Sequence, residues 1–179
     1  MSLSIVSEAP RRVSPAQLRD LTEDTDPVVD ELAMLISRRL SVYAEARLSC
    51  LAEDAGLSSL DLRALAFVIE FGSLSTGHLG QLMGLSHGGV TALINRLETA
   101  GYIQRDRNQH DRRVVTLRPV AERCEPLMHP EQYVVDRIAE IAQRSGNSDL
   151  AGTFDFLMRC MKLLRRDTLQ WLATRELAK

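Results

Sequence analysis

The stretch GLSHGGVTALINRLETAGYIQR, from Gly84 to Arg105, carries the strongest folding signal in the chain. Its first three residues form a short turn that ends on Ser86, a residue type favoured as a helix N-cap. Four apolar residues then recur at helical spacing on one stripe: Val90, Leu93, Ile94 and Leu97. Gly101 follows as a C-terminal signal. The pattern predicts an amphipathic helix from His87 to about Ala100.

A second helix lies immediately before this turn. Ser75 can cap it and Gly84 ends it. Two helices joined by so few residues must cross at a steep angle, which predicts a helix-turn-helix. Further upstream, Ser58 precedes a strongly apolar helix expected over residues 60–71, which should be buried.

Two strand-like segments follow Gly101, namely YIQRD at 102–106 and RRVVTLR at 112–118. A hairpin directly after a helix-turn-helix is a wing. Its tip holds a concentration of charge, with Asp111 expected to hold Arg113 in position. Three arginines lie at this tip: Arg107, Arg112 and Arg113. Because arginine is favoured in a narrow minor groove, the tip is a candidate DNA contact.

The outer arc of the helix predicted from His87 carries small or uncharged side chains: Gly88, Thr91, Ala92, Asn95 and Thr99. Small side chains allow a helix to enter a major groove, and Thr and Asn can reach bases and phosphates. Ser86 and the first backbone N–H groups suit phosphate oxygens. The composition of this arc fits an ordinary solvent-exposed face equally well, but the charged hairpin beside it favours DNA.

The net charge of −2 conceals a local excess of positive charge. Residues 60–118 hold 7 arginines and 5 acidic residues, and within them 86–118 hold 6 arginines and 3 acidic residues. A surface that binds DNA needs such a local excess more than a basic whole chain. No apolar run is long enough to cross a bilayer and no signal peptide is visible, so we expect a cytoplasmic protein without a membrane partner.

The flanking sequence predicts a mainly α-helical fold with a small β-hairpin wing. Residues 1–27 contain three prolines and are expected to be a flexible arm, followed by an apolar helix over 28–56 and the winged helix-turn-helix over 57–118. Residues 119–179 are expected to be helical, with Pro119 in a first turn and interruptions at two further prolines, Pro126 and Pro130. Long apolar stripes near both chain ends predict a homodimer.

The segment from Leu57 to Pro119 resembles the MarR (multiple-antibiotic-resistance regulator) family of bacterial transcription factors. The resemblance is carried by GLSHGGVTALINRLETAGYIQR followed by HDRR at 110–113. It implies an obligate homodimer that grips a pseudo-palindromic double-stranded DNA operator, with half-sites about 10 base pairs apart. By position, it places six residues on the groove-reading surface: Ser86, His87, Gly88, Thr91, Ala92 and Asn95.

The resemblance also implies that Arg96 supports the helix or touches phosphate, and that Asp111 and Arg113 pair at the wing tip. The family often has a long polar or basic residue where Ala92 stands and an Asp where Asn95 stands, so fewer direct base contacts are expected here. Relatives of this kind are often repressors released by a small aromatic or lipophilic effector. Candidate pocket residues in this chain are Tyr43, Arg47 and Phe67.

Two other functions remain open from the sequence. A winged helix that binds protein instead of DNA fits the mild charge and the small Ala92, although the arginine-rich tip disfavours it. A redox-responsive regulator would use one of the three cysteines, Cys50, Cys124 or Cys160. The histidines and cysteines lack metal-ligand spacing, and no catalytic motif is present, so we expect no cofactor, no metal and no enzymatic activity.

Overall fold

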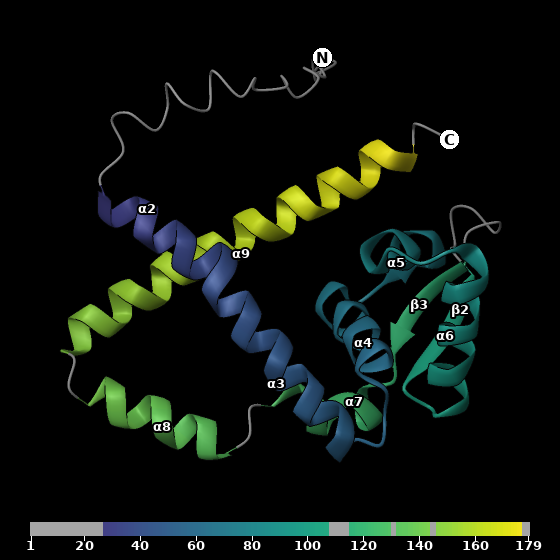
Figure 1. Cartoon of the computed structure of the whole chain (residues 1–179), viewed down its shortest axis with the longest axis horizontal. Helices are drawn as coiled ribbons and strands as arrows, with labels where there is room; N and C mark the ends of the chain where they lie inside the picture. The colour runs from purple at the N-terminus through teal and green to yellow at the C-terminus, as the bar shows by residue number, and fades with distance from the viewer. Residues whose placement is uncertain (1–26, 108–114, 130–131, 144–145, 177–179) are drawn as a thin grey trace, which may run out of the picture. The chain divides into compact units, whose positions relative to one another are not determined.

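The computed structural model describes residues 27–107, 115–129, 132–143 and 146–176, which form two compact units divided after Asp54. The first unit is helical throughout its described part (Figure 1). It consists of α2 (Pro27–Met34), the π-helical turn η1 (Leu35–Arg39) and α3 (Leu40–Asp54). The helix predicted over 28–56 is therefore present, and it ends two residues before Gly56. The arm predicted over 1–27 lies almost wholly outside the described residues.

The described part of the second unit contains the helix-turn-helix of α5 and α6, a small sheet and four further helices (Figure 1). Its elements are α4 (Ser59–Phe71), β1 (Leu74–Ser75), α5 (Thr76–Met83), α6 (His87–Thr99), β2 (Ile103–Arg107), β3 (Val115–Pro119), α7 (Ala121–Met128), α8 (Gln132–Ala142) and α9 (Asn147–Glu176). Among the described helices, none combines the length and the apolar character that a membrane span requires.

Local capping signals explain where the first three helices of this unit begin. The hydroxyls of Ser58, Ser75 and Ser86 each accept a hydrogen bond from the backbone N–H three residues later, at 3.1, 3.0 and 3.3 Å. Each bond satisfies a donor that has no partner within the helix. At the other end of α5, Gly84 adopts a left-handed φ of 65°, which glycine alone adopts without strain. The turn between α5 and α6 is thus set by Gly84 and Ser86, as predicted.

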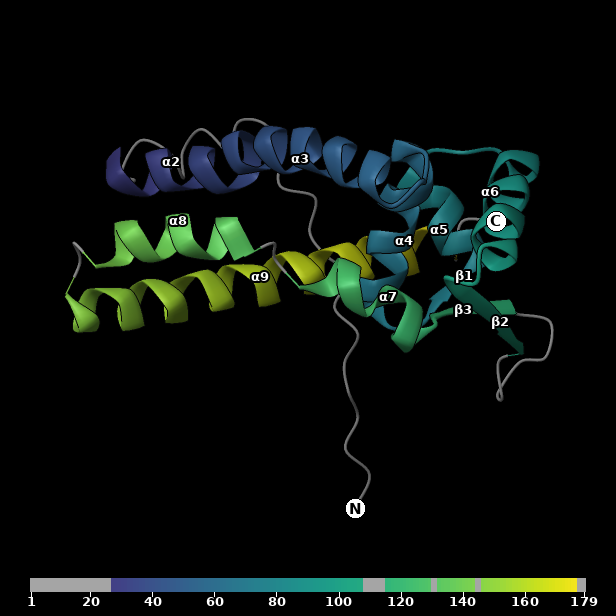
Figure 2. The same cartoon turned by 90° about the horizontal axis from the view of Figure 1, so that it is seen from below.

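The sheet has three antiparallel strands in the order β1-β3-β2 (Figure 2). The hairpin of β2 and β3 was predicted, but β1 was not, because two residues are too short to show strand alternation. In this register Leu74 pairs with Leu117 and Ile103 pairs with Pro119. The prediction that Pro119 occupies a helix first turn is wrong. It ends β3, and pairing continues through Val120, whose N–H donates to the carbonyl of Tyr102 at 2.9 Å.

The helix after the sheet also differs from expectation. α7 runs through Pro126 instead of breaking there, and it ends at Met128. His129 then takes an extended conformation with ψ of 140°. A residue before proline is pushed out of the helical region, so the helix stops before Pro130 and not at Pro126. The last helix, α9, spans Asn147–Glu176, within the region expected to be helical.

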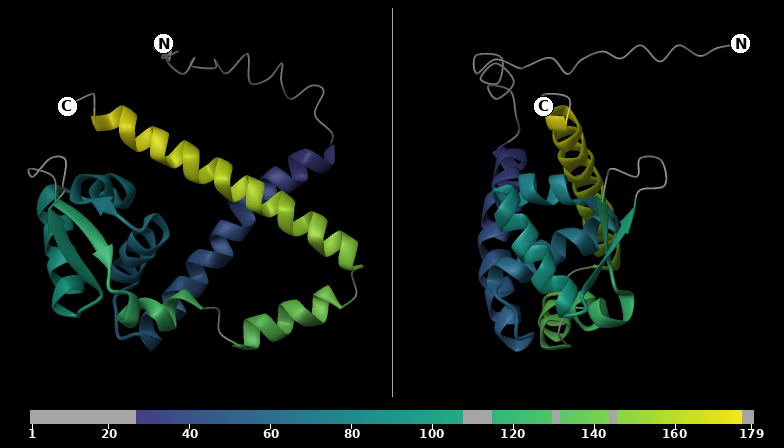
Figure 3. Two further views of the ribbon diagram at one scale, coloured as in Figure 1. Left: turned by 180° about the vertical axis from the view of Figure 1, so that it is seen from behind. Right: turned by 90° about the vertical axis from the view of Figure 1, so that its right-hand side faces the viewer.

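The core of the winged helix lies where α4, α5 and α6 meet the sheet. Seven large apolar side chains from these elements are fully buried: Leu65, Val68, Leu79, Leu93, Ile94, Leu97 and Leu117. α6 lies beside β2 (Figure 3), so the helix and the hairpin form one packed body. This packing fixes which face of α6 remains outside.

Candidate nucleic-acid interface

The two faces of α6 are sharply divided between core and solvent. The predicted apolar stripe of Val90, Leu93, Ile94 and Leu97 is at most 4% exposed. The residues predicted for the outer face are all exposed: Gly88, Thr91, Ala92, Asn95 and Thr99. α6 therefore presents a face with no bulky apolar side chain to its surroundings.

The amino-terminal end of α6 is exposed and ordered by its own side chains. Ser86 and His87 both lie at the surface. The Ser86 hydroxyl accepts from Gly89, as described above, and the Thr91 hydroxyl donates to the carbonyl of His87 at 2.8 Å. Since the Thr91 proton is used within the helix, its oxygen lone pairs and methyl group are what this side chain offers outward.

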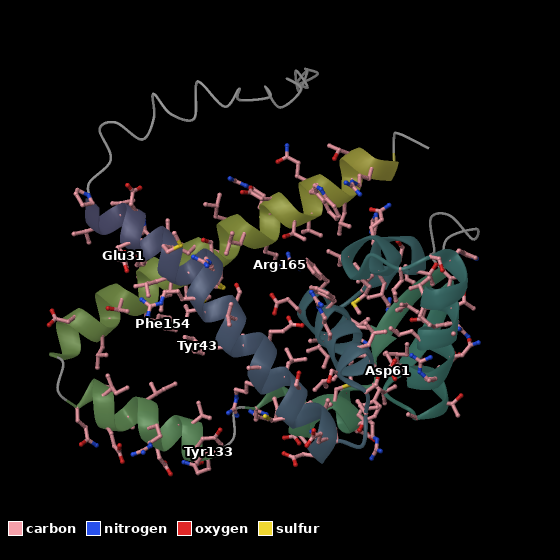
Figure 4. All side chains as sticks on the ribbon, viewed as in Figure 1. Glu31, Tyr43, Asp61, Tyr133, Phe154 and Arg165 are labelled. Atoms are coloured by element: carbon pink, nitrogen blue, oxygen red, sulfur yellow. The ribbon has the colours of Figure 1, made fainter. Side chains whose placement is uncertain are left out.

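An ion pair between Arg96 and Asp61 joins α6 to α4. The guanidinium of Arg96 donates from Nε to Asp61 Oδ2 at 3.0 Å and from Nη2 to Oδ1 at 2.6 Å. Asp61, labelled in Figure 4, is 5% exposed, whereas about half of the Arg96 side chain is open to solvent. Of the two roles implied for Arg96, this geometry favours support of the helix.

The Asp61 carboxylate remains charged in this setting. Burial alone would raise its pKa, but hydrogen bonds from Arg96 and Ser58 and the attraction of the guanidinium outweigh burial and hold the pKa below its ordinary value of 3.8. The same pairing raises the pKa of Arg96. No local signal in the sequence indicates that Asp61 has a partner 35 residues away.

A second cluster links the outer face of α6 to β2. Arg105 donates from Nη2 to the Asn95 side-chain oxygen at 2.5 Å, and its Nη1 pairs with the carboxylate of Glu98. Asn95 was predicted to lie on the reading face, but Arg105 was not predicted as its neighbour. Helical spacing explains why: it assigns Asn95 to a face, but it says nothing about which strand residue lies next to it.

The carboxyl end of α6 sets the direction of the hairpin. Gly101 has a φ of 77°, and the N–H of Tyr102 reaches back to the carbonyl of Leu97 at 3.0 Å. This is a Schellman turn, in which a left-handed glycine satisfies the last carbonyls of a helix. β2 therefore leaves α6 at a fixed angle.

The wing tip lies largely outside the described residues. This applies to Asp111, Arg112 and Arg113, and for Arg107 only the backbone is described, at the end of β2. In the described part of the hairpin, Arg118 pairs with Asp106 at 3.0 Å. The predicted Asp111–Arg113 pair thus remains a prediction.

The candidate pocket residues are divided between the two units. Tyr43 and Arg47 belong to α3, where Tyr43 is exposed and Arg47 half-buried, and Phe67 is half-buried on α4. No grouping of three metal-ligating side chains is present among the described residues.

The cysteines differ in accessibility. Cys124 is fully buried, and burial raises the pKa of its thiol despite a hydrogen bond with the backbone of Val120. Its Sγ lies 3.3 Å from the carbonyl oxygen of Tyr102, to which it donates. A buried thiol with a raised pKa is unreactive, which removes Cys124 from the redox candidates. Cys50 is exposed and Cys160 half-buried.

A steep helix pair, an exposed small-residue face on its second helix and an adjoining strand hairpin together define a winged helix-turn-helix. Residues 55–114 match the sequence profile of the MarR family. The match covers the winged helix-turn-helix, so this domain is similar to that of MarR-family transcriptional regulators.

Similar proteins extend the likeness beyond this domain. The chain is 25% identical over 146 residues to the uncharacterized HTH-type transcriptional regulator YcgE of Bacillus subtilis (strain 168), covering 82% of this chain and 95% of the relative. The structure of the transcriptional regulator Tm0710 from Thermotoga maritima matches with a TM-score of 0.54 and 21% identity, over 76% of this chain and 96% of that one.

A further structural match is a single-substitution mutant of MepR from a multidrug-resistant S. aureus clinical isolate. Its TM-score is 0.56 at 13% identity, and the match covers 72% of this chain and 94% of that chain. At such identities the two structures establish a shared fold and nothing more specific.

Proposed function

We propose that the chain is a homodimeric repressor that binds a pseudo-palindromic operator through α6 and the wing, and that a small aromatic or lipophilic effector releases it. The observation that carries the DNA part is the outer face of α6. That face is exposed along its length, carries no bulky apolar group and is held rigidly by the Asp61–Arg96 pair. A rigid helix with short side chains is the shape that a major groove admits.

Gly88 supports this interpretation because the described fold does not need a glycine there. An added Cβ at Gly88 would meet no described atom within 4 Å, and its φ is not left-handed. The small size of this residue is therefore better explained by an approaching partner than by packing within the chain. Ala92 is a second small residue exposed on the same face.

A charge-insertion experiment tests the DNA proposal. Ala92→Glu should weaken binding of the full chain to the promoter region upstream of its own gene by about a hundredfold, because a carboxylate would face the bases and phosphates. Ala121→Glu, at an exposed position in the first turn of α7, is the matched control and should bind normally. Equal, weak binding of all three proteins to every sequence would favour the protein-interaction alternative instead.

The wing has its own test. Arg113→Ala should lower the affinity for DNA. It should also reduce the steepness of log affinity against log salt concentration by about one unit, the change expected for one lost phosphate contact. An unchanged slope would remove Arg113 from the interface while leaving the role of α6 standing.

The dimer proposal rests on the long helices. Large apolar side chains are exposed on α2 and α3 and on α8 and α9, among them Val28, Val42, Ile138, Ile141, Phe154 and Met161. A single chain rarely leaves so much apolar surface in water, and closed twofold pairing is the commonest way to cover it. Sedimentation of the full chain across a range of concentrations is the direct measurement.

The effector proposal rests on the resemblance to the MarR family, and its candidate on α4 is the half-buried aromatic side chain of Phe67. The measurement is loss of operator binding on titration with salicylate as the probe. Phe67→Ala should lower sensitivity to salicylate without changing affinity for DNA. If salicylate leaves binding unchanged at millimolar concentration, an aromatic acid is not the effector.

A further inference from the structure

Asn95 and Arg105 form a contact that bears on which base the protein selects. Asn95 is exposed in the middle of the outer face of α6, and Arg105 reaches it from β2. A guanidinium can only donate hydrogen bonds, so the atom of the Asn95 amide that faces it must be the oxygen, Oδ1. This contact fixes which way round the amide stands, which an isolated asparagine leaves undetermined.

The fixed orientation has a chemical consequence. With Oδ1 turned toward β2, the Nδ2 group with its two protons is turned away from Arg105. An asparagine that is free to orient both ends pairs with adenine, donating to N7 and accepting from the N6 amino group. An asparagine whose oxygen is already engaged is chiefly a donor, and guanine is the base that offers two major-groove acceptors, N7 and O6.

Glu98 makes the orientation firmer. Arg105 pairs with the Glu98 carboxylate through Nη1 and donates a hydrogen bond to Asn95 through Nη2. The planar guanidinium is therefore held at two points. The Arg105 and Glu98 side chains are 33% and 38% exposed, so the pair is partly withdrawn from solvent. The same pairing neutralises a carboxylate that would otherwise repel DNA.

We propose that Arg105 is a positioning residue that locks Asn95 as a hydrogen-bond donor, and that Asn95 thereby selects guanine at one position of each operator half-site. This proposal rests on the proposed binding of DNA through α6. It adds a specific base and a second residue, on a strand, that determines the choice.

The test is selection from a random double-stranded DNA library with the full-length protein, followed by sequencing of the bound fraction. The wild type should enrich a motif in which one guanine per half-site loses its preference in Asn95→Ala. Asn95→Asp keeps an acceptor for Arg105 and removes the donor. It should therefore disfavour guanine at that position by about tenfold and favour cytosine, whose N4 amino group donates.

A double variant tests the positioning role of Arg105 by replacing both Arg105 and its ion-pair partner Glu98. In the double variant Arg105→Gln, Glu98→Gln the net charge is unchanged and the amide of Asn95 is no longer fixed. Guanine and adenine should then be accepted at the same position at comparable levels, a change that lost stability alone would not produce. Arg118→Gln is the matched control, because it removes an arginine of the same sheet that pairs with Asp106 and not with α6. It should keep the wild-type motif.

The outcomes separate the two proposals. If the wild type enriches no motif, binding of specific DNA by α6 fails and this inference fails with it. If a motif is enriched but is the same in Asn95→Asp and in the double variant, DNA binding stands and the role of Arg105 is overturned.

Discussion

The winged helix and the long helices α3 and α9 are both built on apolar helical patterns, but they bury them to different extents. In the winged helix, the apolar stripe of α6 is almost fully covered by the chain itself. Phe154 on α9 and Tyr43 on α3, both labelled in Figure 4, are each 67% exposed. An apolar pattern thus predicts a helix in both regions, but it predicts a core within the single chain in only one of them.

The largest expected effect concerns the buried apolar stripe of α6 in the winged helix. Leu93→Ala removes a side chain that is 0% exposed in the middle of the α6 stripe. It should lower the free energy of unfolding by about 2–5 kcal/mol, through lost transfer energy and a residual cavity. Urea unfolding followed by circular dichroism measures it. Thr99→Ala, on the outer face of the same helix, is the control and should change stability by less than about 0.5 kcal/mol.

The second prediction tests whether the exposed apolar face of α9 is covered by a second copy of the chain. If the apolar face of α9 is covered by a second copy, Phe154→Asp places a charge in that interface and should raise the dimer dissociation constant about tenfold to a hundredfold. Analytical ultracentrifugation measures this constant. Arg159→Gln, which alters an exposed ion pair on the same helix, should leave the constant unchanged. A wild type that is monomeric at all concentrations would contradict the dimer proposal itself.

A smaller effect is expected at the ion pair that joins α4 to α6. Asp61→Asn should lower the free energy of unfolding by about 1–2 kcal/mol, because two charge-assisted hydrogen bonds are lost. The effect is no larger because the Arg96 side chain is half exposed to water. Asp106→Asn breaks the more exposed pair with Arg118 and should cost less than about 0.5 kcal/mol. Urea unfolding of the three proteins compares them.

The Asp61 pair also predicts a pH dependence. The folded protein lowers the pKa of Asp61 below 3.8, so the folded state holds this proton less tightly than the unfolded state does. The stabilisation is complete well above pH 3.8 and is lost as the pH falls through the lower, folded pKa. The difference in unfolding free energy between wild type and Asp61→Asn should therefore be largest at neutral pH and shrink below pH 3.8. A constant difference down to about pH 3 would assign the effect to packing.

These pairs mark the limit of what the sequence could predict. The caps at Ser75 and Ser86 and the turn at Gly84 are local signals, so the helix-turn-helix and the exposed face of α6 could be predicted from residue type and spacing. The Asp61–Arg96 and Asn95–Arg105 contacts join separate elements, and helical periodicity assigns a face without naming the neighbour. β1 was not predicted either, because this two-residue strand is defined by its pairing with β3, which lies far away in the sequence.

The smallest predicted effect separates two roles of Ser86, whose hydroxyl caps α6 and lies exposed at the end proposed to meet a phosphate. Ser86→Ala should cost about 1 kcal/mol of stability, whereas Ser86→Gly should cost only a few tenths, because glycine is itself a tolerated N-cap. Both variants lack the hydroxyl. If that hydroxyl contacts DNA, the two should lose operator affinity equally despite their unequal stability, which a filter-binding titration at fixed salt can measure. Affinity that follows stability would instead limit Ser86 to its capping role and leave the backbone N–H groups of α6 as the phosphate donors.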